Sequence, residues 1–209
     1  MEPEIEDLAK FLNKMGAKIE GAGTNLVKIT GVRNLRDVGY KVMPDRIETG
    51  TFLCMAAATH GKIKLINTIP EHITPIIHKL QECGCEIELE KNSIKIDARK
   101  NLKAVDIKTM PYPGFPTDMQ SIFASVLSIS KGTSIVVENI FENRFKYINE
   151  LKRMGAKITI EGKTAIIKGV KKLNGTVVSS SDLRGGAALV TAALSAKGVT
   201  QVENIQYIL

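Results

Sequence analysis

A repeated pattern of helix, glycine and hairpin constrains this sequence more than any other feature. Three segments share one order of residues: apolar and charged positions spaced as in an amphipathic helix, then glycine, then a short alternating strand. Their glycines recur at intervals of about 70 residues, and regular self-similarity on this scale indicates a repeated structural unit. The three copies are residues 12–19, 80–87 and 151–158.

A second threefold series is offset from the first. Each of its copies begins with an aspartate suited to capping a helix, continues through an apolar helix rich in alanine or serine, stops at glycine and enters a β-branched strand. These helices carry little charge and should be buried, whereas the helices of the first series have one apolar face and should lie nearer solvent. The buried helices are expected at 47–59, 119–130 and 183–196, and the others at 5–15, 73–83 and 145–154.

The two series together predict an α+β fold built from repeated units of two helices and a mixed sheet. If the units surround a pseudo-threefold axis, the N-termini of the buried helices converge and the positive ends of their dipoles point to a common place. Such a place is suited to binding an anion. The guanidinium groups of Arg46, Arg144 and Arg184 are candidates for binding a carboxylate or phosphate there, or each could form an ordinary surface ion pair.

The composition is that of an ordinary globular protein. Of the 209 residues, 44% are hydrophobic and 24% are charged, and no apolar stretch approaches the length that crosses a bilayer. The acidic N-terminus lacks the pattern of a signal sequence, so we expect a cytoplasmic protein with no membrane partner. Cys54, Cys83 and Cys85 form no CxxC pair and the histidines have no ligand spacing, so we expect reduced thiols, no metal and no other cofactor.

The net charge of +7 indicates an anionic partner. The basic residues are scattered, aromatic residues make up only 5% of the chain, and no basic stripe alternates with aromatic side chains. We therefore expect no nucleic-acid partner, since a phosphorylated small molecule accounts for the same charge. A basic RNA-binding domain is the alternative, and its affinity would fall steeply with salt.

The most unusual loop, residues 110–119, contains three of the seven prolines and leads into a buried helix. Proline fixes φ and keeps the preceding residue extended, so this loop should be a rigid entry that ends at Asp118. Asp118 is then either a helix N-cap or a carboxylate held for chemistry. Residues 141–145 place Glu142 and Arg144 between two phenylalanines, where they could serve a site or, in Glu142's case, cap the next helix.

Several of these segments resemble the enolpyruvyl transferase family, in order and along the whole chain. The matching residues are Pro113–Gln120, Phe141–Phe145, Leu151–Ala156, Ser181–Arg184 and Pro44–Thr51. Members that act on UDP-N-acetylglucosamine are the nearer match, and those that act on 3-phosphoshikimate are more distant. The resemblance implies the family's inside-out α/β barrel. It also implies a bacterial cytoplasmic enzyme of peptidoglycan synthesis, and so of cell shape and division, which moves the enolpyruvyl group of phosphoenolpyruvate to the 3-hydroxyl of UDP-N-acetylglucosamine.

The resemblance also implies roles for individual residues. Asp118 has the position of the family's proposed general base, which contacts the acceptor hydroxyl. Ile140 has the position that lies against the nucleotide sugar, and Arg144 and Arg184 match arginines on the phosphoenolpyruvate side of the cleft. We include Glu142, from the same motif, among the expected substrate-binding residues.

Some parts of the family pattern have no counterpart in the sequence: the mobile loop with the catalytic cysteine, the N-terminal Lys-Asn pair and a late arginine. We therefore expect residues 1–43 to be a helix and hairpin from the end of the first family domain, and residues 44–209 to be most of the second domain without its last helix and hairpin. Such a fragment should be inactive alone, because only one wall of the cleft is present.

Two alternatives remain open. The chain could be a module that binds a nucleotide sugar or serves as a scaffold without chemistry, or part of an enzyme of the 3-phosphoshikimate type. We also expect residues 1–43 to complete the second domain, either within the chain or by self-association with a second copy.

Overall fold

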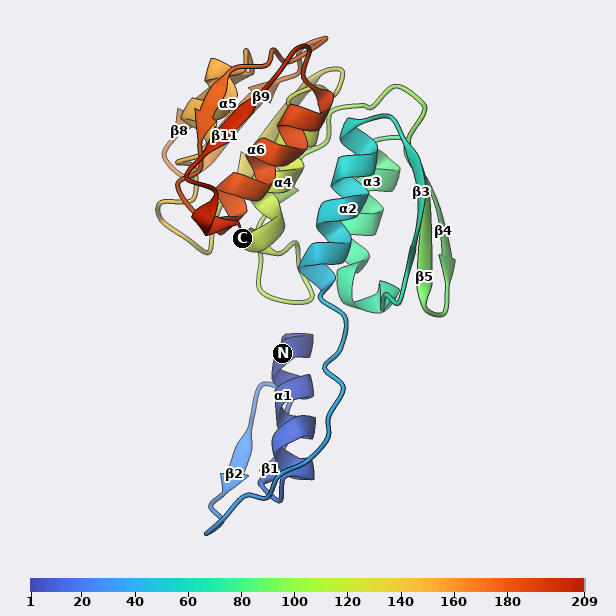
Figure 1. Ribbon diagram of the computed structural model, residues 1–209, viewed down its shortest axis with the longest axis vertical. Helices are drawn as coiled ribbons and strands as arrows, with labels where there is room; N and C mark the ends of the chain where they lie inside the picture. The colour runs from blue at the N-terminus through green and yellow to red at the C-terminus, as the bar shows by residue number, and fades with distance from the viewer. Residues whose placement is uncertain (209) are drawn as a thin grey trace. The chain divides into compact units, whose positions relative to one another are not determined.

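The computed structural model describes residues 1–208, which form two compact units that divide between Asp45 and Arg46. The N-terminal unit consists of helix α1 (Pro3–Lys14) and the antiparallel strands β1 (Lys18–Glu20) and β2 (Lys28–Thr30) (Figure 1). The Asn13 side chain both donates to the carbonyl of Ile19 and accepts from its amide, each at 2.8 Å, so the end of the helix is tied to the hairpin.

Three helices form the centre of the second unit: α2 (Arg46–Ala58), α4 (Thr117–Leu127) and α6 (Leu183–Ser195). They contact one another and lie side by side (Figure 1). Every residue of α4 from Met119 to Leu127 is buried. The prediction that the low-charge helices are buried is therefore confirmed, most fully for α4.

Serine hydroxyls set the register between α4 and α6. Ser121 Oγ donates to the carbonyl of Arg184 at 2.9 Å, and Ser125 Oγ donates to the carbonyl of Ala188 at 2.7 Å. Because both partners advance by four residues, the two helices run parallel, and their first turns lie at the same end of the unit.

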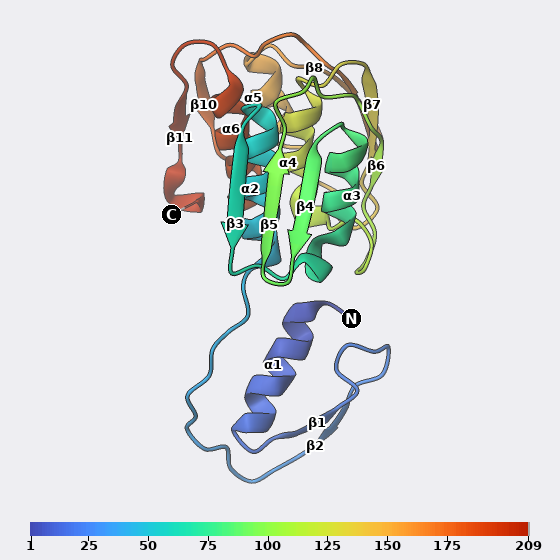
Figure 2. The same cartoon turned by 90° about the vertical axis from the view of Figure 1, so that its right-hand side faces the viewer.

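Sheets surround these helices. In the sheet with the order β3–β5–β4 all neighbours are antiparallel, whereas in the sheet with the order β6–β7–β9–β8 the first pair is parallel. β10 and β11 form a separate parallel pair. The strands are β3 (Lys62–Ile66), β4 (Glu86–Glu90), β5 (Ser93–Asp97), β6 (Ile107–Lys108), β7 (Thr133–Val137), β8 (Lys157–Glu161), β9 (Thr164–Lys168), β10 (Val177–Ser179) and β11 (Gln201–Glu203). Figure 2 shows the first of these sheets face-on, with α2 behind it.

The remaining helices are short. The helix α3 (Thr74–Glu82) follows a 3₁₀ turn, η1 (Pro70–Ile73), and buries Ile76, Ile77 and Leu80 while its other side chains reach the surface. The helix α5 (Ile148–Arg153) is shorter than the predicted helix 145–154, because residues 142–147 form turns instead. A final 3₁₀ turn is η2 (Ile205–Tyr207).

The repeat glycines have the same role in all three copies. Gly16, Gly84 and Gly155 follow the ends of α1, α3 and α5 with φ of +108°, +102° and +95°, in the region that favours glycine. In each copy the amide of the following residue donates to a carbonyl five residues earlier, as in the Schellman motif. The helix ends predicted from the repeat are therefore built alike.

All three cysteines are buried free thiols. Burial raises the pKa of Cys83 to about 12 and that of Cys85 to about 11, so both thiols stay protonated at neutral pH. Among residues 1–208 no helix is both long and apolar enough to cross a membrane.

Candidate active site

Asp118 lies between two arginines at the end of the unit where α4 and α6 begin. Arg144 Nη2 donates to Asp118 Oδ1 at 2.5 Å, and Arg184 Nη2 donates to Asp118 Oδ2 at 2.9 Å. Each carboxylate oxygen therefore accepts a charged hydrogen bond from a different guanidinium. We call Asp118, Arg144 and Arg184 the carboxylate–arginine cluster.

Three different segments supply this cluster. Asp118 is in the first turn of α4, Arg184 is in the first turn of α6, and Arg144 lies in the turns between β7 and α5. The serine bonds between α4 and α6 fix the first two segments relative to each other. Residues 66 positions apart in the chain thus meet because the two repeat helices are parallel.

Asp118 does not cap its helix, which corrects the N-cap interpretation. The N-cap position of α4 is Pro116, which has no side-chain acceptor, and Asp118 lies two residues inside the helix. The corresponding Asp182 does cap α6, because its carboxylate accepts from the amides of Arg184 and Gly185 at 3.0 and 2.9 Å. The Asp118 carboxylate instead makes its hydrogen bonds to the arginines.

The cluster is partly shielded from solvent. The exposed side-chain fraction is 37% for Asp118, 17% for Arg144 and 25% for Arg184. Partial burial raises the pKa of Asp118, but the hydrogen bonds and charges of Arg184 and Arg144 lower it by more, so the pKa lies below its ordinary value. The carboxylate is ionised at neutral pH, and its bonds to the arginines make it a weaker proton acceptor.

Arg144 is held in place by further contacts. Its guanidinium lies over the Phe141 ring, 5.1 Å from the centroid, and its Nη2 also approaches the carbonyl of Thr117 at 3.4 Å. Its Nε is buried and has no hydrogen-bond partner among the described residues. The cluster therefore contains donors beyond those used by Asp118, as a site for an anion requires.

The other predicted site residues lie outside this cluster. Ile140 is 42% exposed at the start of the turns that carry Arg144. Glu142 is exposed and makes no hydrogen bond or ion pair with the part of the chain that the structure describes, so it does not cap α5, whose N-cap position is Tyr147. The guanidinium of Arg46 lies over the Tyr112 ring, 5.4 Å from its centroid.

Two groups next to the cluster were missed by the sequence predictions. Glu138, the residue after β7, is 1% exposed and accepts four hydrogen bonds, one of them from Thr117. Tyr147 is buried, and its hydroxyl donates to Gln120 Oε1 at 3.2 Å. The only available sequence signal was a glutamate that directly follows a strand of apolar residues in the unit that contains Asp118.

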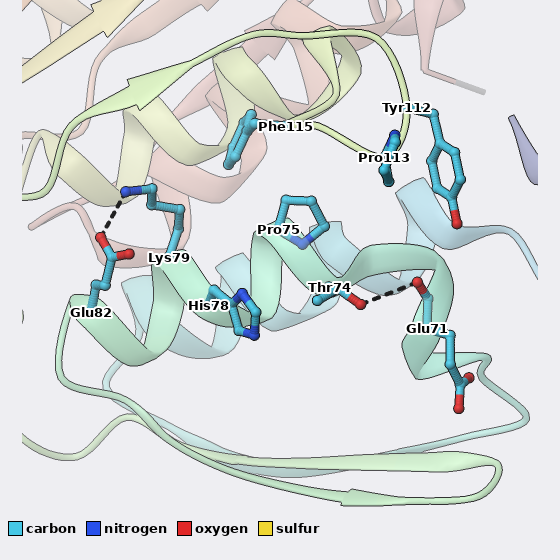
Figure 3. Close-up of a pocket in the computed structure, with 9 residues that line it drawn as sticks. All are labelled: Glu71, Thr74, Pro75, His78, Lys79, Glu82, Tyr112, Pro113 and Phe115. Atoms are coloured by element: carbon cyan, nitrogen blue, oxygen red, sulfur yellow. Dashed lines mark hydrogen bonds and ion pairs between the residues drawn. The ribbon is translucent and has the colours of Figure 1, made fainter. Parts of the chain in front are cut away.

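A groove of about 540 Å³ runs along α3, opposite the loop that leads to α4 (Figure 3). Its rim carries the Lys79–Glu82 ion pair, at 2.7 Å. No member of the carboxylate–arginine cluster lines it. The lining residues are Glu71, Thr74, Pro75, His78, Lys79, Glu82, Tyr112, Pro113 and Phe115.

Among residues 1–208 no group of three or more His, Cys, Asp or Glu side chains could hold a metal ion.

Comparison with known proteins places this chain in a family. The model of the family described as EPSP synthase (3-phosphoshikimate 1-carboxyvinyltransferase) matches residues 1–208. The chain belongs to this enolpyruvyl transferase family. The resemblance seen in the sequence motifs is thereby confirmed.

Two relatives within the family have the same name, UDP-N-acetylglucosamine 1-carboxyvinyltransferase. The enzyme of Caldanaerobacter subterraneus subsp. tengcongensis whose name ends in the number 2 is 56% identical over 208 residues, which are 99% of this chain and 50% of the enzyme's own length. The protein of Desulfofundulus thermocisternus is 55% identical over 203 residues, 97% of this chain and 84% of its own length. The chain thus spans about half the length of the Caldanaerobacter enzyme.

Solved structures confirm the fold class. The enolpyruvyl transferase NikO from Streptomyces tendae matches with a TM-score of 0.86 at 24% identity, covering 100% of this chain and 50% of the NikO chain. EPSP synthase from Acinetobacter baumannii matches with a TM-score of 0.72 at 18% identity, covering 96% of this chain and 50% of its own. The predicted α+β fold of enolpyruvyl transferases is therefore correct.

Proposed function

We propose that this chain is part of a transferase that moves the enolpyruvyl group of phosphoenolpyruvate to the 3-hydroxyl of UDP-N-acetylglucosamine, in the cytoplasmic synthesis of peptidoglycan. The observation that carries this proposal is the Asp118 carboxylate held between Arg144 and Arg184. One group that can accept a proton and two that can bind an anion are the parts that this reaction needs in one place. The names of the relatives at 56% and 55% identity support the choice of acceptor.

The proposed chemistry follows from these three side chains. Asp118 accepts the proton of the acceptor hydroxyl while the hydroxyl oxygen forms a bond to C2 of phosphoenolpyruvate; the double bond between C2 and C3 is lost in this step, and C3 takes up a proton from solvent. Arg144 and Arg184 bind the anionic groups of phosphoenolpyruvate, which draws them from the carboxylate and leaves it a stronger base. The bond from C2 to the phosphate oxygen then breaks as C3 gives up a proton to solvent, which restores the double bond, and the proton held by Asp118 leaves to phosphate or solvent. We include Ile140 as a residue that faces the nucleotide sugar and Glu142 as a further substrate-binding residue.

A second candidate is transfer to 3-phosphoshikimate. The matching family model favours this candidate, because its description names 3-phosphoshikimate 1-carboxyvinyltransferase. Both acceptors present a hydroxyl and an anionic group, so the carboxylate–arginine cluster suits either. The choice between them is a question of acceptor binding, which an activity assay can answer.

The test is a hybrid enzyme in which these 209 residues replace the segment they match in the Caldanaerobacter relative. The hybrid should release phosphate from phosphoenolpyruvate with UDP-N-acetylglucosamine and not with shikimate 3-phosphate, whereas the 209-residue chain alone should release none. The Caldanaerobacter enzyme itself is the positive control. Phosphate release with shikimate 3-phosphate only, or a folded hybrid that is inactive with both acceptors, would contradict the proposal.

A further inference from the structure

Glu138 has an unusual environment directly beside the carboxylate–arginine cluster. It follows β7, and its side chain is almost entirely buried, at 1% exposure. Its Oε1 accepts from Thr109 Oγ1 at 2.8 Å and from the amides of Ile140 and Phe141 at 2.8 and 3.1 Å, while its Oε2 accepts from Thr117 Oγ1 at 3.0 Å. All four partners are neutral donors.

No cation compensates this buried carboxylate. Among residues 1–208 no lysine, arginine or histidine forms an ion pair with Glu138. Burying a carboxylate costs free energy unless hydrogen bonds replace its water, and here neutral hydroxyl and amide donors do so. An apolar residue at this position would leave two hydroxyl groups and two backbone amides without their acceptor, so the carboxylate holds these four donors in place.

The repeat provides an internal comparison. The sequence Val-Glu-Asn-Ile occurs at 137–140 and again at 202–205, in each case at the end of the strand that follows a buried helix. The second glutamate, Glu203, is exposed at the end of β11. Of these two glutamates, the structure buries the one next to Asp118.

The hydrogen bonds of Glu138 join two segments that form the site. Thr117 immediately precedes Asp118 in the first turn of α4. Ile140 and Phe141 begin the turns that carry Arg144, and the Phe141 ring lies under its guanidinium. Glu138 therefore connects the backbone on the Asp118 side of the cluster to the backbone on the Arg144 side.

We propose that Glu138 is a positioning residue: its carboxylate fixes the Thr117 hydroxyl and the Ile140 and Phe141 amides so that Asp118 and Arg144 face each other. The proposal deepens the proposed function and rests on it for the meaning of the site. The hydrogen-bond geometry is independent of which substrate is used. Glu138 is not expected to touch the reacting groups itself. It acts through Thr117 and through the turn that begins at Ile140 and Phe141.

The test follows the titration of the Asp118 carboxyl carbon by ¹³C NMR in the 209-residue chain, with the resonance assigned by its loss in Asp118→Asn. Glu138→Ala should raise the pKa of Asp118 toward its ordinary value, because the turn that carries Arg144 is no longer fixed. Glu138→Gln should not raise it, because the amide oxygen keeps three bonds and the amide nitrogen can donate to Thr117. Glu203→Ala is the matched control and should leave the titration unchanged.

A folded Glu138→Ala chain with an unchanged Asp118 titration would overturn the proposal. If Glu138→Ala does not fold, Thr117→Val removes one of the four hydrogen bonds and should raise the pKa of Asp118, whereas Thr117→Ser should not. An unchanged pKa in Thr117→Val would then overturn it. Because no substrate is used, this outcome can be told apart from a failure of the transferase assay.

Discussion

At the scale of single residues, the two arginines determine what Asp118 can do. While both of its oxygens accept charged hydrogen bonds, its pKa is lowered and it is a poor proton acceptor. The proposed reaction therefore needs an anion to compete for Arg144 and Arg184 before the acceptor hydroxyl loses its proton. In the proposed reaction, substrate binding thus makes Asp118 a stronger base.

The lowered pKa has a consequence for stability against pH. A carboxyl whose folded-state pKa is lowered adds stability above its unfolded pKa of about 3.9, and that stability is lost as the pH falls through the lower folded-state value. The difference in melting temperature between the wild-type chain and Asp118→Asn should thus be constant near neutral pH and shrink below about pH 4. Melting curves from pH 3 to pH 7 check this, and a difference that grows in acid would contradict it.

The sequence identified the members of the cluster but not how they meet. The motif that contains Asp118, together with the arginines at helix entries, selected Asp118, Arg144 and Arg184, but the same argument also selected Arg46, which lies outside the cluster. Glu138 was missed because a glutamate after a strand is usually exposed, and only the tertiary structure shows that this one is buried. The N-cap interpretation of Asp118 failed because local sequence cannot show that two distant guanidinium groups bind its oxygens.

At the scale of elements, the position of the site depends on the parallel contact between α4 and α6. Ser125 is fully buried and donates to the carbonyl of Ala188, while Ser121 bonds to the carbonyl of Arg184 itself. Small residues along both helices allow their backbones to come this close. The register of this helix pair therefore brings Arg184 beside Asp118.

Loss of the buried Ser125 hydroxyl should weaken this contact. Ser125→Ala removes the hydrogen bond to the carbonyl of Ala188 and should lower the free energy of unfolding by about 1 kcal/mol. Ser195→Ala is the control and should cost less, since the hydrogen bond of the Ser195 hydroxyl that the structure describes is to the carbonyl of Ala192, within the same helix. Urea denaturation measures the free energy of unfolding of the two variants. Equal losses would show that the hydrogen bond between the helices adds nothing to that free energy.

The helices could be predicted well because their signals are local. The predicted helix 183–196 is found at Leu183–Ser195, and the predicted helix 47–59 is found at Arg46–Ala58. The predicted helix 145–154 was wrong in its first turn, because residues 142–147 form turns in which Tyr147 is buried and bonded to Gln120. Periodicity could not distinguish that packing from the face of a helix.

At the scale of the whole molecule, the chain contains the carboxylate–arginine cluster but only about half the length of a full enzyme of the family. It belongs to the enolpyruvyl transferase family and spans about half the length of the Caldanaerobacter enzyme. The proposed proton acceptor and the two proposed anion-binding groups are all in the unit that begins at Arg46. The hybrid enzyme therefore places this cluster in a full-length relative, where each of its residues can be tested.

The most direct measurement is the turnover of the hybrid enzyme with phosphoenolpyruvate and UDP-N-acetylglucosamine, before and after Asp118→Asn. Asparagine keeps the size and one acceptor oxygen but cannot take the proton, so turnover should fall by about 10²-fold or more, far beyond what any loss of folded protein at the assay temperature explains. Asp106→Asn is the control: the Asp106 side chain is exposed and, among residues 1–208, accepts from the amide of Ile135, so turnover should be unchanged. If Asp118→Asn leaves turnover intact, or lowers it only as far as it unfolds the protein, Asp118 is not the base.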